Sequence, residues 1–256
     1  MQSTPATTAP ERASSRAVAD GGSVDVWWIQ LAGRADVDDC MAVLSPAELA
    51  DVRRRKRQVD AEALAVSRAA LRGILASHLG VAPRDVPLER RCHVCGGPHG
   101  RPVVRATNVS LHCSLSRTRS HAVAAVGEAA LGVDVEWIRP LPDLASLAET
   151  FAPAEQAALR ALPNDERVAA FFTLWARKEA YLKARGEGLT RDMKDFVVSA
   201  PQEPAALVSS AAGDAAAIAM VDLPTPDAAL AAALAVAAPD LAVRTHTWPG
   251  LPADER

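Results

Sequence analysis

The stretch Leu131–Trp137, LGVDVEW, decides how the rest of the chain is interpreted. Its apolar and acidic residues alternate, which predicts a β-strand whose successive side chains point to opposite faces. Asp134 and Glu136 then lie on one face, while the two valines and the tryptophan line the other. Neighbouring carboxylates repel each other, and a cation or a proton between them relieves the repulsion. The strand therefore predicts a cation-binding face or, as the alternative, a solvated outer face of a sheet.

A second stretch, Phe171–Lys183, FFTLWARKEAYLK, has the spacing of an amphipathic helix. On a helical wheel its aromatic residues form one apolar arc, and Lys178 and Glu179 fall within that arc, with Lys183 one turn beyond Glu179. Buried charges are normally paired or bound to a ligand. A simple pair between Glu179 and Lys183 explains Lys183. It does not explain Lys178, unless that long side chain carries its ammonium group out to water.

Together the two stretches supply three carboxylates and two ammonium groups. The oxygens of Asp134, Glu136 and Glu179 suit Mg²⁺, which completes its shell with water and substrate phosphate. Lys178 and Lys183 suit the phosphate oxygens. The residue chemistry therefore predicts Mg²⁺-dependent phosphoryl-type transfer or a phosphate-binding site.

Composition limits the other classes of function. The chain has 256 residues, of which 49% are hydrophobic and 23% charged, as in a globular protein with a sizeable core. A formal net charge of −3 argues against nucleic-acid binding driven by bulk charge. The longest apolar run, residues 228–238, is shorter than the about 20 residues that cross a bilayer, and the N-terminus lacks a secretory pattern. We therefore expect a cytoplasmic protein that binds neither nucleic acid nor membrane.

The order of predicted elements indicates an α+β fold. Residues 1–22 are rich in Thr, Ser, Ala and Pro and are expected to form a disordered tail. Ser45 and Glu48 have the spacing of a capping box that begins a helix, and a later helix ends at Gly80. Strands are expected at 24–31, 111–115, 121–126, 131–137, 196–199, 215–221 and 229–237, and helices from 46, 64 and 153 and over 167–184. Residues 23–127 and 128–256 are expected to form an N-terminal and a C-terminal subdomain.

The strand and the helix together resemble the signature pair of the Sfp-type 4′-phosphopantetheinyl transferases. The family pattern is G-V-D-V/I-E, followed later by W-x-x-K-E-A-x-x-K, and this chain has GVDVE at 132–136 and WARKEAYLK at 175–183. GEGL at 186–189 is similar to the family's G-x-G-L. Segments 100–102, 114–117 and 151–155 resemble three further family segments, G-K/R-P, N-L-S-H and F-S-x-x-E, so the similarity spans roughly residues 44 to 190.

The resemblance implies two similar α/β subdomains in a pseudo-twofold arrangement, with the active site in the cleft between them and a monomer sufficient for activity. It implies transfer of the 4′-phosphopantetheine arm of coenzyme A to a serine of an apo acyl or peptidyl carrier protein, with release of 3′,5′-ADP. Such carriers serve fatty-acid, polyketide or nonribosomal-peptide synthesis.

The resemblance also implies roles for individual residues. Asp134, Glu136 and Glu179 would hold Mg²⁺, and Glu179 would also be the base for the serine hydroxyl. Lys183 and Lys178 would contact the phosphates, so that Asp134, Glu179 and Lys183 form the implied catalytic set. Arg101, Ser116 and Arg117 would bind the nucleotide end of coenzyme A, and Pro102 would belong to the same cofactor-binding set.

The chain departs from the family pattern in three places. Arg117 stands where the family often has His, and Ser114 where it has Asn. Arginine stays charged and can bind phosphate through two donors, so phosphate binding should persist while a pH dependence tied to histidine should not. Lysines often found early in the first long helix are replaced at Glu48 and Asp51. The basic block 53–57 could compensate, although a solvated helix face is the simpler interpretation.

Other interpretations stay open at this level. Cys92, Cys95 and His99 could supply three zinc ligands, with a shaped loop carrying free thiols as the simpler alternative. The chain could also be a non-catalytic module that binds coenzyme A or a carrier protein, or a zinc-loop interaction protein whose acidic strand is only surface. Binding of coenzyme A without release of 3′,5′-ADP would indicate the module. Stoichiometric zinc without a response to Mg²⁺ or coenzyme A would indicate the zinc-loop protein.

Overall fold

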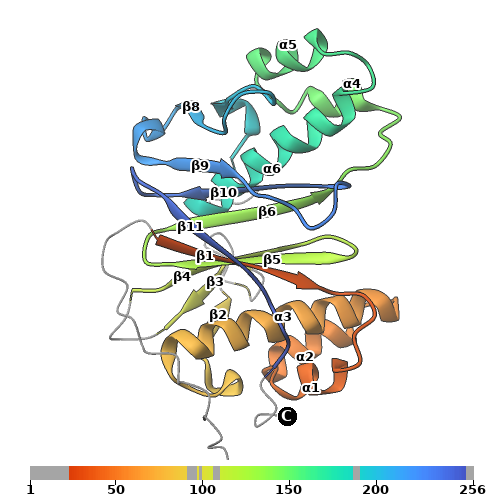
Figure 1. Ribbon diagram of the computed structural model, residues 1–256, viewed down its shortest axis with the longest axis vertical. Helices are drawn as coiled ribbons and strands as arrows, with labels where there is room; N and C mark the ends of the chain where they lie inside the picture. Colours follow the sequence, from red (N-terminus) through yellow and green to blue (C-terminus); the bar gives the residue numbers. More distant parts are fainter. Residues whose placement is uncertain (1–22, 91–96, 98–99, 106–109, 187–190, 252–256) are drawn as a thin grey trace, which may run out of the picture.

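The computed structural model describes residues 23–90, 97, 100–105, 110–186 and 191–251. Two sheets lie face to face, and each carries a long helix on its outer side (Figure 1). The structure thus confirms the predicted α+β class. The expected tail, residues 1–22, and the Cys92, Cys95 and His99 group lie outside the described residues.

The strands form two main sheets and two short pairs. The first sheet has the order β11-β1-β5-β4, with β1 (Ser23–Gln30), β4 (His112–Arg117), β5 (His121–Gly127) and β11 (Ala242–Thr247). The second has the order β6-β10-β9, with β6 (Leu131–Trp137), β9 (Ala219–Asp222) and β10 (Leu230–Val236). The short pairs are β2 (Leu88–Arg90) with β3 (Pro102–Val104), and β7 (Phe196–Val198) with β8 (Leu207–Ser210).

The helices divide into two groups, one for each sheet (Figure 1). The first sheet is covered by α1 (Val37–Ala42), α2 (Pro46–Arg53) and α3 (Gln58–Leu79). The second is covered by α4 (Leu144–Ala148), α5 (Pro153–Ala161) and α6 (Arg167–Arg185). Single 3₁₀ turns are η1 (Pro83–Asp85), η3 (Met193–Asp195) and η4 (Ala215–Ala217), the last of which replaces the start of the strand expected at 215–221.

Local sequence signals set the start of α2 and the end of α3 as predicted, whereas α3 begins at Gln58 and not at the expected residue 64. The Ser45 hydroxyl accepts the Glu48 N–H at 3.3 Å, and the Glu48 carboxylate accepts the Ser45 N–H at 2.9 Å, which is the expected capping box. The same carboxylate accepts a 2.7 Å bond from Arg72 Nε of α3, so the cap also ties α2 to α3. Gly80 ends α3 with φ +67°, a conformation that other residues rarely adopt.

The core between the two sheets explains the alternation in β6. Val133 and Val135 pack against residues of β1 and β5, whereas Gly132 and Asp134 face α6 and the edge of β4. Asp134 is 3% exposed. The alternative of a solvated outer face is therefore wrong.

Helix α6 is buried on two sides, which the helical wheel does not indicate. Its aromatic side packs with α5 and β7, and its small-residue side packs against β6 and β10. Ala176, Ala180 and Ala184 on that second side are 1%, 0% and 4% exposed. Alanine contributes little to an apolar arc on a wheel, yet it permits close approach of the helix to the sheet.

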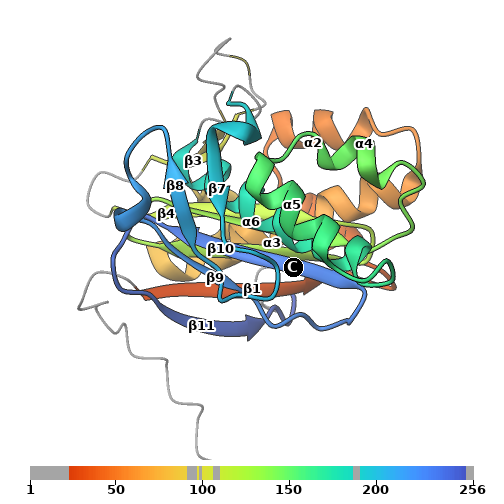
Figure 2. The same cartoon turned by 90° about the horizontal axis from the view of Figure 1, so that it is seen from above.

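The C-terminal strand crosses from one half of the chain to the other. After β10, the chain passes to the first sheet, where β11 pairs with β1 in parallel and lies beside it in Figure 2. Asp25 of β1 accepts two bonds from Arg244, at 2.8 and 2.9 Å, and one from His246 at 2.9 Å. The sequence-based division at residue 127 therefore does not describe β11, which belongs to the sheet of the N-terminal half.

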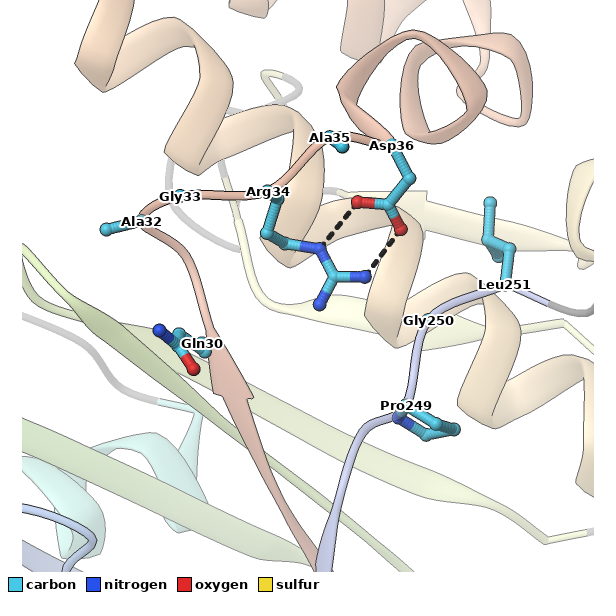
Figure 3. A pocket seen from close by; sticks show the side chains of 9 residues that line it. All are labelled: Gln30, Ala32, Gly33, Arg34, Ala35, Asp36, Pro249, Gly250 and Leu251. Carbon is cyan, nitrogen blue, oxygen red and sulfur yellow. Dashed lines mark hydrogen bonds and ion pairs between the residues drawn. The ribbon is translucent and has the colours of Figure 1, made fainter.

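The segment after β11 continues this attachment. Trp248 and Leu251 enter the core beneath α3, and Arg34 lies over the Trp248 ring at 4.5 Å. Figure 3 shows Arg34 and Asp36 joined by two hydrogen bonds, of 2.7 and 2.5 Å, beside a hollow that residues 249–251 also line. Across the described residues, no helix is long and apolar enough to span a membrane.

Candidate active site

The site is built where β6, α6 and β4 meet. Gly132 makes the contact between β6 and α6 possible, because a Cβ at this position would lie 2.6 Å from Lys183 Cβ and closer still to backbone atoms of Ala180 and Ala184. No side chain fits in that space. Glycine in the GVDVE motif therefore lets α6 lie directly on β6.

Asp134 is the central acid of the site. Its Oδ1 accepts a 2.5 Å bond from Lys183 Nζ and a 2.7 Å bond from Ser116 Oγ. Its Oδ2 is buried and has no hydrogen-bond partner among the described residues. A buried carboxylate oxygen without a partner costs free energy, so Oδ2 is available for a further ligand.

Glu136 and Glu179 lie close enough to Asp134 to feel its charge. Burial, and then the charge of Asp134, raise the pKa of Glu136 from 4.5 to about 7. The same two causes, in the same order, raise the pKa of Glu179. Lys183 opposes both shifts. The structure thus brings together the three carboxylates that the sequence selected, and they lack sufficient positive charge around them.

Lys183 is held at the edge of β6 and faces this group. Its ammonium group donates to Asp134 Oδ1 and, at 3.2 Å, to the carbonyl oxygen of Val133. An ammonium group has three donors, and the Lys183 side chain is 29% exposed. The third donor can therefore reach a ligand that enters from solvent.

Lys178 lies elsewhere, and the prediction that it contacts phosphate is wrong. Its ammonium group is fully buried and donates to Glu155 Oε1 at 2.6 Å and to the Phe196 carbonyl oxygen at 2.7 Å. It also lies over the Phe196 ring at 4.1 Å. At about 100° per residue, Lys178 points about 140° away from Lys183 around α6. The Lys178 ammonium group lies neither beside the three predicted carboxylates nor in water. It instead holds α6 to α5 and β7.

The residues predicted for the nucleotide end do not form one cluster. Arg101 donates from Nη1 to the carbonyl oxygen of Ala184 at 3.3 Å and lies 3.3 Å from His112 Nδ1, at the first residue of β4. Pro102 follows it in β3. Arg117 is the last residue of β4, roughly 17 Å along that strand from His112. Arg101 and Arg117 therefore lie at opposite ends of β4.

Arg117 faces α3 rather than α6. Its guanidinium group makes no hydrogen bond or ion pair with any described residue, and burial, then repulsion by Arg55, lower its pKa. Arg68 of α3 adds to that repulsion, and its own Nε is buried without a partner. Asp60 opposes the lowering, and Asp51 pairs with Arg68 at 2.7 Å, so the three arginines carry more charge than these two acids balance, which favours an anion.

Sequence reasoning missed two residues that shape the site indirectly. Arg177 is fully buried and binds Asp222 through two bonds of 2.9 and 2.6 Å, together with several backbone carbonyls. Glu155 accepts Lys178 and also the N–H groups of Ala152 and Val198, at 2.9 and 2.8 Å. Its spacing after Pro153 identifies a helix start, but no local signal identifies its partner on α6.

The donor set fits a divalent cation, although a preformed centre is absent. Among the described residues, no three His, Cys, Asp or Glu side chains are gathered into a group that could hold a metal as they stand. Lys183 instead balances the charge of Asp134. A cation bound here would give Asp134 Oδ2 a partner and would lower the raised pKa values of Glu136 and Glu179. The two hollows beside Arg34 contain none of the predicted site residues.

Comparison with known proteins gives a consistent result. Residues 130–233, which contain β6 and α6, match the 4′-phosphopantetheinyl transferase superfamily. The 4′-phosphopantetheinyl transferase HetI of Nostoc sp. (strain PCC 7120) is 34% identical over 194 residues, which cover 74% of this chain and 79% of HetI. Sfp of Bacillus subtilis is 23% identical over 163 residues, 64% of this chain and 69% of Sfp. AcpT of Salmonella typhimurium is 36% identical over 92 residues, 35% of this chain and 47% of AcpT. With the GVDVE strand and the WARKEAYLK helix meeting at one buried acid, this chain belongs to the 4′-phosphopantetheinyl transferase superfamily.

Proposed function

We propose that this protein transfers the 4′-phosphopantetheine arm of coenzyme A to a serine of an apo acyl or peptidyl carrier protein, with release of 3′,5′-ADP. The observation that carries the proposal is the convergence of Asp134, Glu136 and Glu179 with Lys183 where α6 lies on β6. Family membership supplies the class of reaction. A non-catalytic binding module would need no such group of acids beside a partly exposed ammonium group.

In this proposal Asp134, Glu136 and Glu179 hold Mg²⁺, with Asp134 contributing its unpartnered Oδ2. The cation would stabilise charge on the pyrophosphate oxygens of coenzyme A. Lys183 has a third donor for the same oxygens, and its bond to Asp134 keeps its ammonium group beside the acids. Positioning and electrostatic stabilisation account for most of the catalysis of phosphoryl transfer, so the enzyme needs no covalent nucleophile.

Glu179 is proposed as the base. The carrier serine oxygen forms a bond to the β-phosphorus, the bond from that phosphorus to the bridging oxygen breaks, and 3′,5′-ADP leaves with the bonding electron pair. The serine proton passes to the Glu179 carboxylate, directly or through water. Burial and the charge of Asp134 raise the pKa of Glu179, which makes it a better proton acceptor than a solvated glutamate.

The nucleotide end of coenzyme A is proposed to lie against β4 and the start of α3. The Arg117 guanidinium group has no ion-pair partner there among the described residues, and Arg55 and Arg68 add positive charge that Asp60 offsets in part. Arg101 and Pro102, at the other end of β4, would contact a different part of this long ligand. The block 53–57 is exposed beside this region and suits an acidic carrier surface, whose binding would weaken with added salt.

We further propose that residues 23–127 and 128–256 are two similar subdomains in a pseudo-twofold arrangement, with β11 exchanged into the first. A sheet with a long helix on its outer side in each half supports this arrangement, as does the position of the acids beside β4 at the seam. The active site would then be completed within one chain, so a monomer in the cytoplasm would suffice.

The test is intact-mass spectrometry of a panel of apo carrier proteins from fatty-acid, polyketide and nonribosomal-peptide synthesis, incubated with coenzyme A and Mg²⁺. We expect a gain of one phosphopantetheine arm and equimolar 3′,5′-ADP. Glu179→Gln and Asp134→Asn should abolish the gain, whereas Glu149→Gln, at an exposed glutamate outside the site, should not. Normal turnover in either site variant would refute the assignment of the acids. Coenzyme A binding without 3′,5′-ADP would indicate a binding module instead.

A further inference from the structure

The seam between the two sheets is closed by side chains. β4 is the edge of the first sheet and β6 is the edge of the second, and no ladder of backbone bonds joins them among the described residues. An edge strand leaves backbone N–H and C=O groups that need partners. At Val133 of β6, Ser114 Oγ accepts the N–H at 3.1 Å and Lys183 Nζ donates to the C=O. Ser114, which stands where the family pattern has Asn, thus supplies a hydrogen-bond acceptor to the edge of β6.

Two residues further along β4, Ser116 acts on the next residue of β6. Side chains two apart on a strand point to the same face, so Ser114 and Ser116 both face β6. Ser114 contacts the backbone of Val133, and Ser116 contacts the side chain of Asp134. Ser116 Oγ donates to Asp134 Oδ1 at 2.7 Å, and the serine is 9% exposed. Arg117, one position later, points to the opposite face, toward α3.

The hydroxyl of Ser116 has a single proton, and that proton is directed at a carboxylate. An ionised carboxylate only accepts hydrogen bonds, and so does a phosphate oxygen. Ser116 therefore cannot donate to a phosphate while it holds Asp134. Together with Lys183 it occupies Oδ1 and leaves Oδ2 as the one unpartnered oxygen of Asp134.

We infer that Ser116 is a positioning residue for the metal-binding acid Asp134 and not a ligand of the coenzyme A nucleotide. The inference rests on the proposed function, because it takes Asp134 to be a cation ligand. Fixing Oδ1 from two elements, β4 and α6, sets the rotation of the carboxylate and so the direction of Oδ2. Partners of this kind outside the ligand set typically change metal affinity about ten- to a hundredfold.

The test measures two ligands separately on the purified full-length protein. Mn²⁺ binding is followed by electron paramagnetic resonance of the free ion, and 3′,5′-ADP binding without metal is followed by calorimetry. We expect Ser116→Ala and the near-isosteric, weakly donating Ser116→Cys to weaken Mn²⁺ binding about tenfold or more, with 3′,5′-ADP affinity within twofold of wild type. Ser116→Thr keeps the hydroxyl and should restore Mn²⁺ binding. Thermal melting confirms that each variant is folded.

Arg117→Ala is the matched control, since it lies next on the same strand and faces the other way. It should weaken 3′,5′-ADP and leave Mn²⁺ affinity unchanged. If Ser116→Cys and Ser116→Ala weaken 3′,5′-ADP and spare Mn²⁺, the inference is overturned while the proposed function stands. If wild-type protein binds 3′,5′-ADP but no Mn²⁺, the metal assignment is refuted and the inference with it. If wild type binds neither, the proposed function itself fails.

Discussion

Replacing Gly132 with alanine is expected to push α6 away from β6 and so to move Lys183 away from Asp134. The added Cβ would lie 2.6 Å from Lys183 Cβ, against 3.4 Å or more in ordinary contact. This contact alone requires α6 to retreat by roughly 0.8 Å, and the backbone atoms of Ala180 and Ala184 require more, because backbone cannot rotate away. The 2.5 Å bond between Lys183 and Asp134 would then be lost.

Two separate losses should follow. Overpacking of this kind costs about 1–3 kcal/mol of unfolding free energy, and more where backbone must move. A displacement of catalytic groups by about 1 Å can also lower the rate about a hundredfold. Urea unfolding measures the first loss. Transfer to an apo carrier protein, followed by mass spectrometry at a temperature where the variant is fully folded, measures the second.

The control is Gly73→Ala in α3. Its Cβ would meet only side-chain atoms, Leu251 Cδ2 at 3.3 Å and Trp248 Nε1 at 3.7 Å, and alanine gains up to about 1 kcal/mol in helix propensity. We expect near wild-type stability and activity. If Gly132→Ala matched this control in both assays, the close packing of α6 on β6 would not be what holds Lys183 at Asp134.

Three further outcomes are expected. Lys178→Met should cost about 3–5 kcal/mol in urea unfolding, because it leaves buried Glu155 without its cation, and Lys178→Met with Glu155→Gln should recover part of that loss. In protein freed of divalent cations, Glu136 has its pKa raised from 4.5 to about 7, so the stability it contributes is complete below about pH 4.5 and is lost as pH rises through 7. Unfolding experiments from pH 4 to 8 should show this slope in wild type and a smaller one in Glu136→Gln. Removal of Mg²⁺ with EDTA should stop transfer. Added Mg²⁺ should raise the melting temperature more at pH 8 than at pH 5, because protons compete with Mg²⁺ for the acids at pH 5. Equal shifts in melting temperature at both pH values would contradict the acid assignment.

Local patterns allowed much of the fold to be predicted. The bounds of β6 agree with the strand expected at 131–137, and α6 extends only one residue beyond the helix expected at 167–184. Each element carries its own local signal. In β6, apolar and acidic residues alternate with period two, and in α6 the apolar residues follow the helical period until Gly186, in the left-handed region, ends the helix. The acids were found in the same way, since placing Asp134 and Glu136 on one face requires only the strand period.

Contacts between distant segments were not predictable in this way. β11 has alternating but mostly exposed residues and gains its place from pairing with β1, where Arg244 meets Asp25 across 219 positions. Ser116 is another case. It was assigned to the nucleotide by its place in a family segment, whereas its partner is set by how the edge of β4 meets β6. No property of residues 114–117 alone distinguishes these two roles.

The charges of the WARKEAYLK helix divide between the site and the scaffold according to their angle around α6. Glu179 and Lys183 lie about 40° apart and face β6, whereas Lys178 lies about 100° from Glu179 and faces α5 and β7. Glu155 and the Phe196 carbonyl bind Lys178 on that side, so the pair fixes the rotation of α6 about its axis. That rotation decides whether Glu179 reaches Asp134 at all. Lys178 therefore influences the chemistry without touching substrate, and its loss should lower the fraction of folded enzyme before it changes coenzyme A affinity, whereas loss of Lys183 should do the reverse.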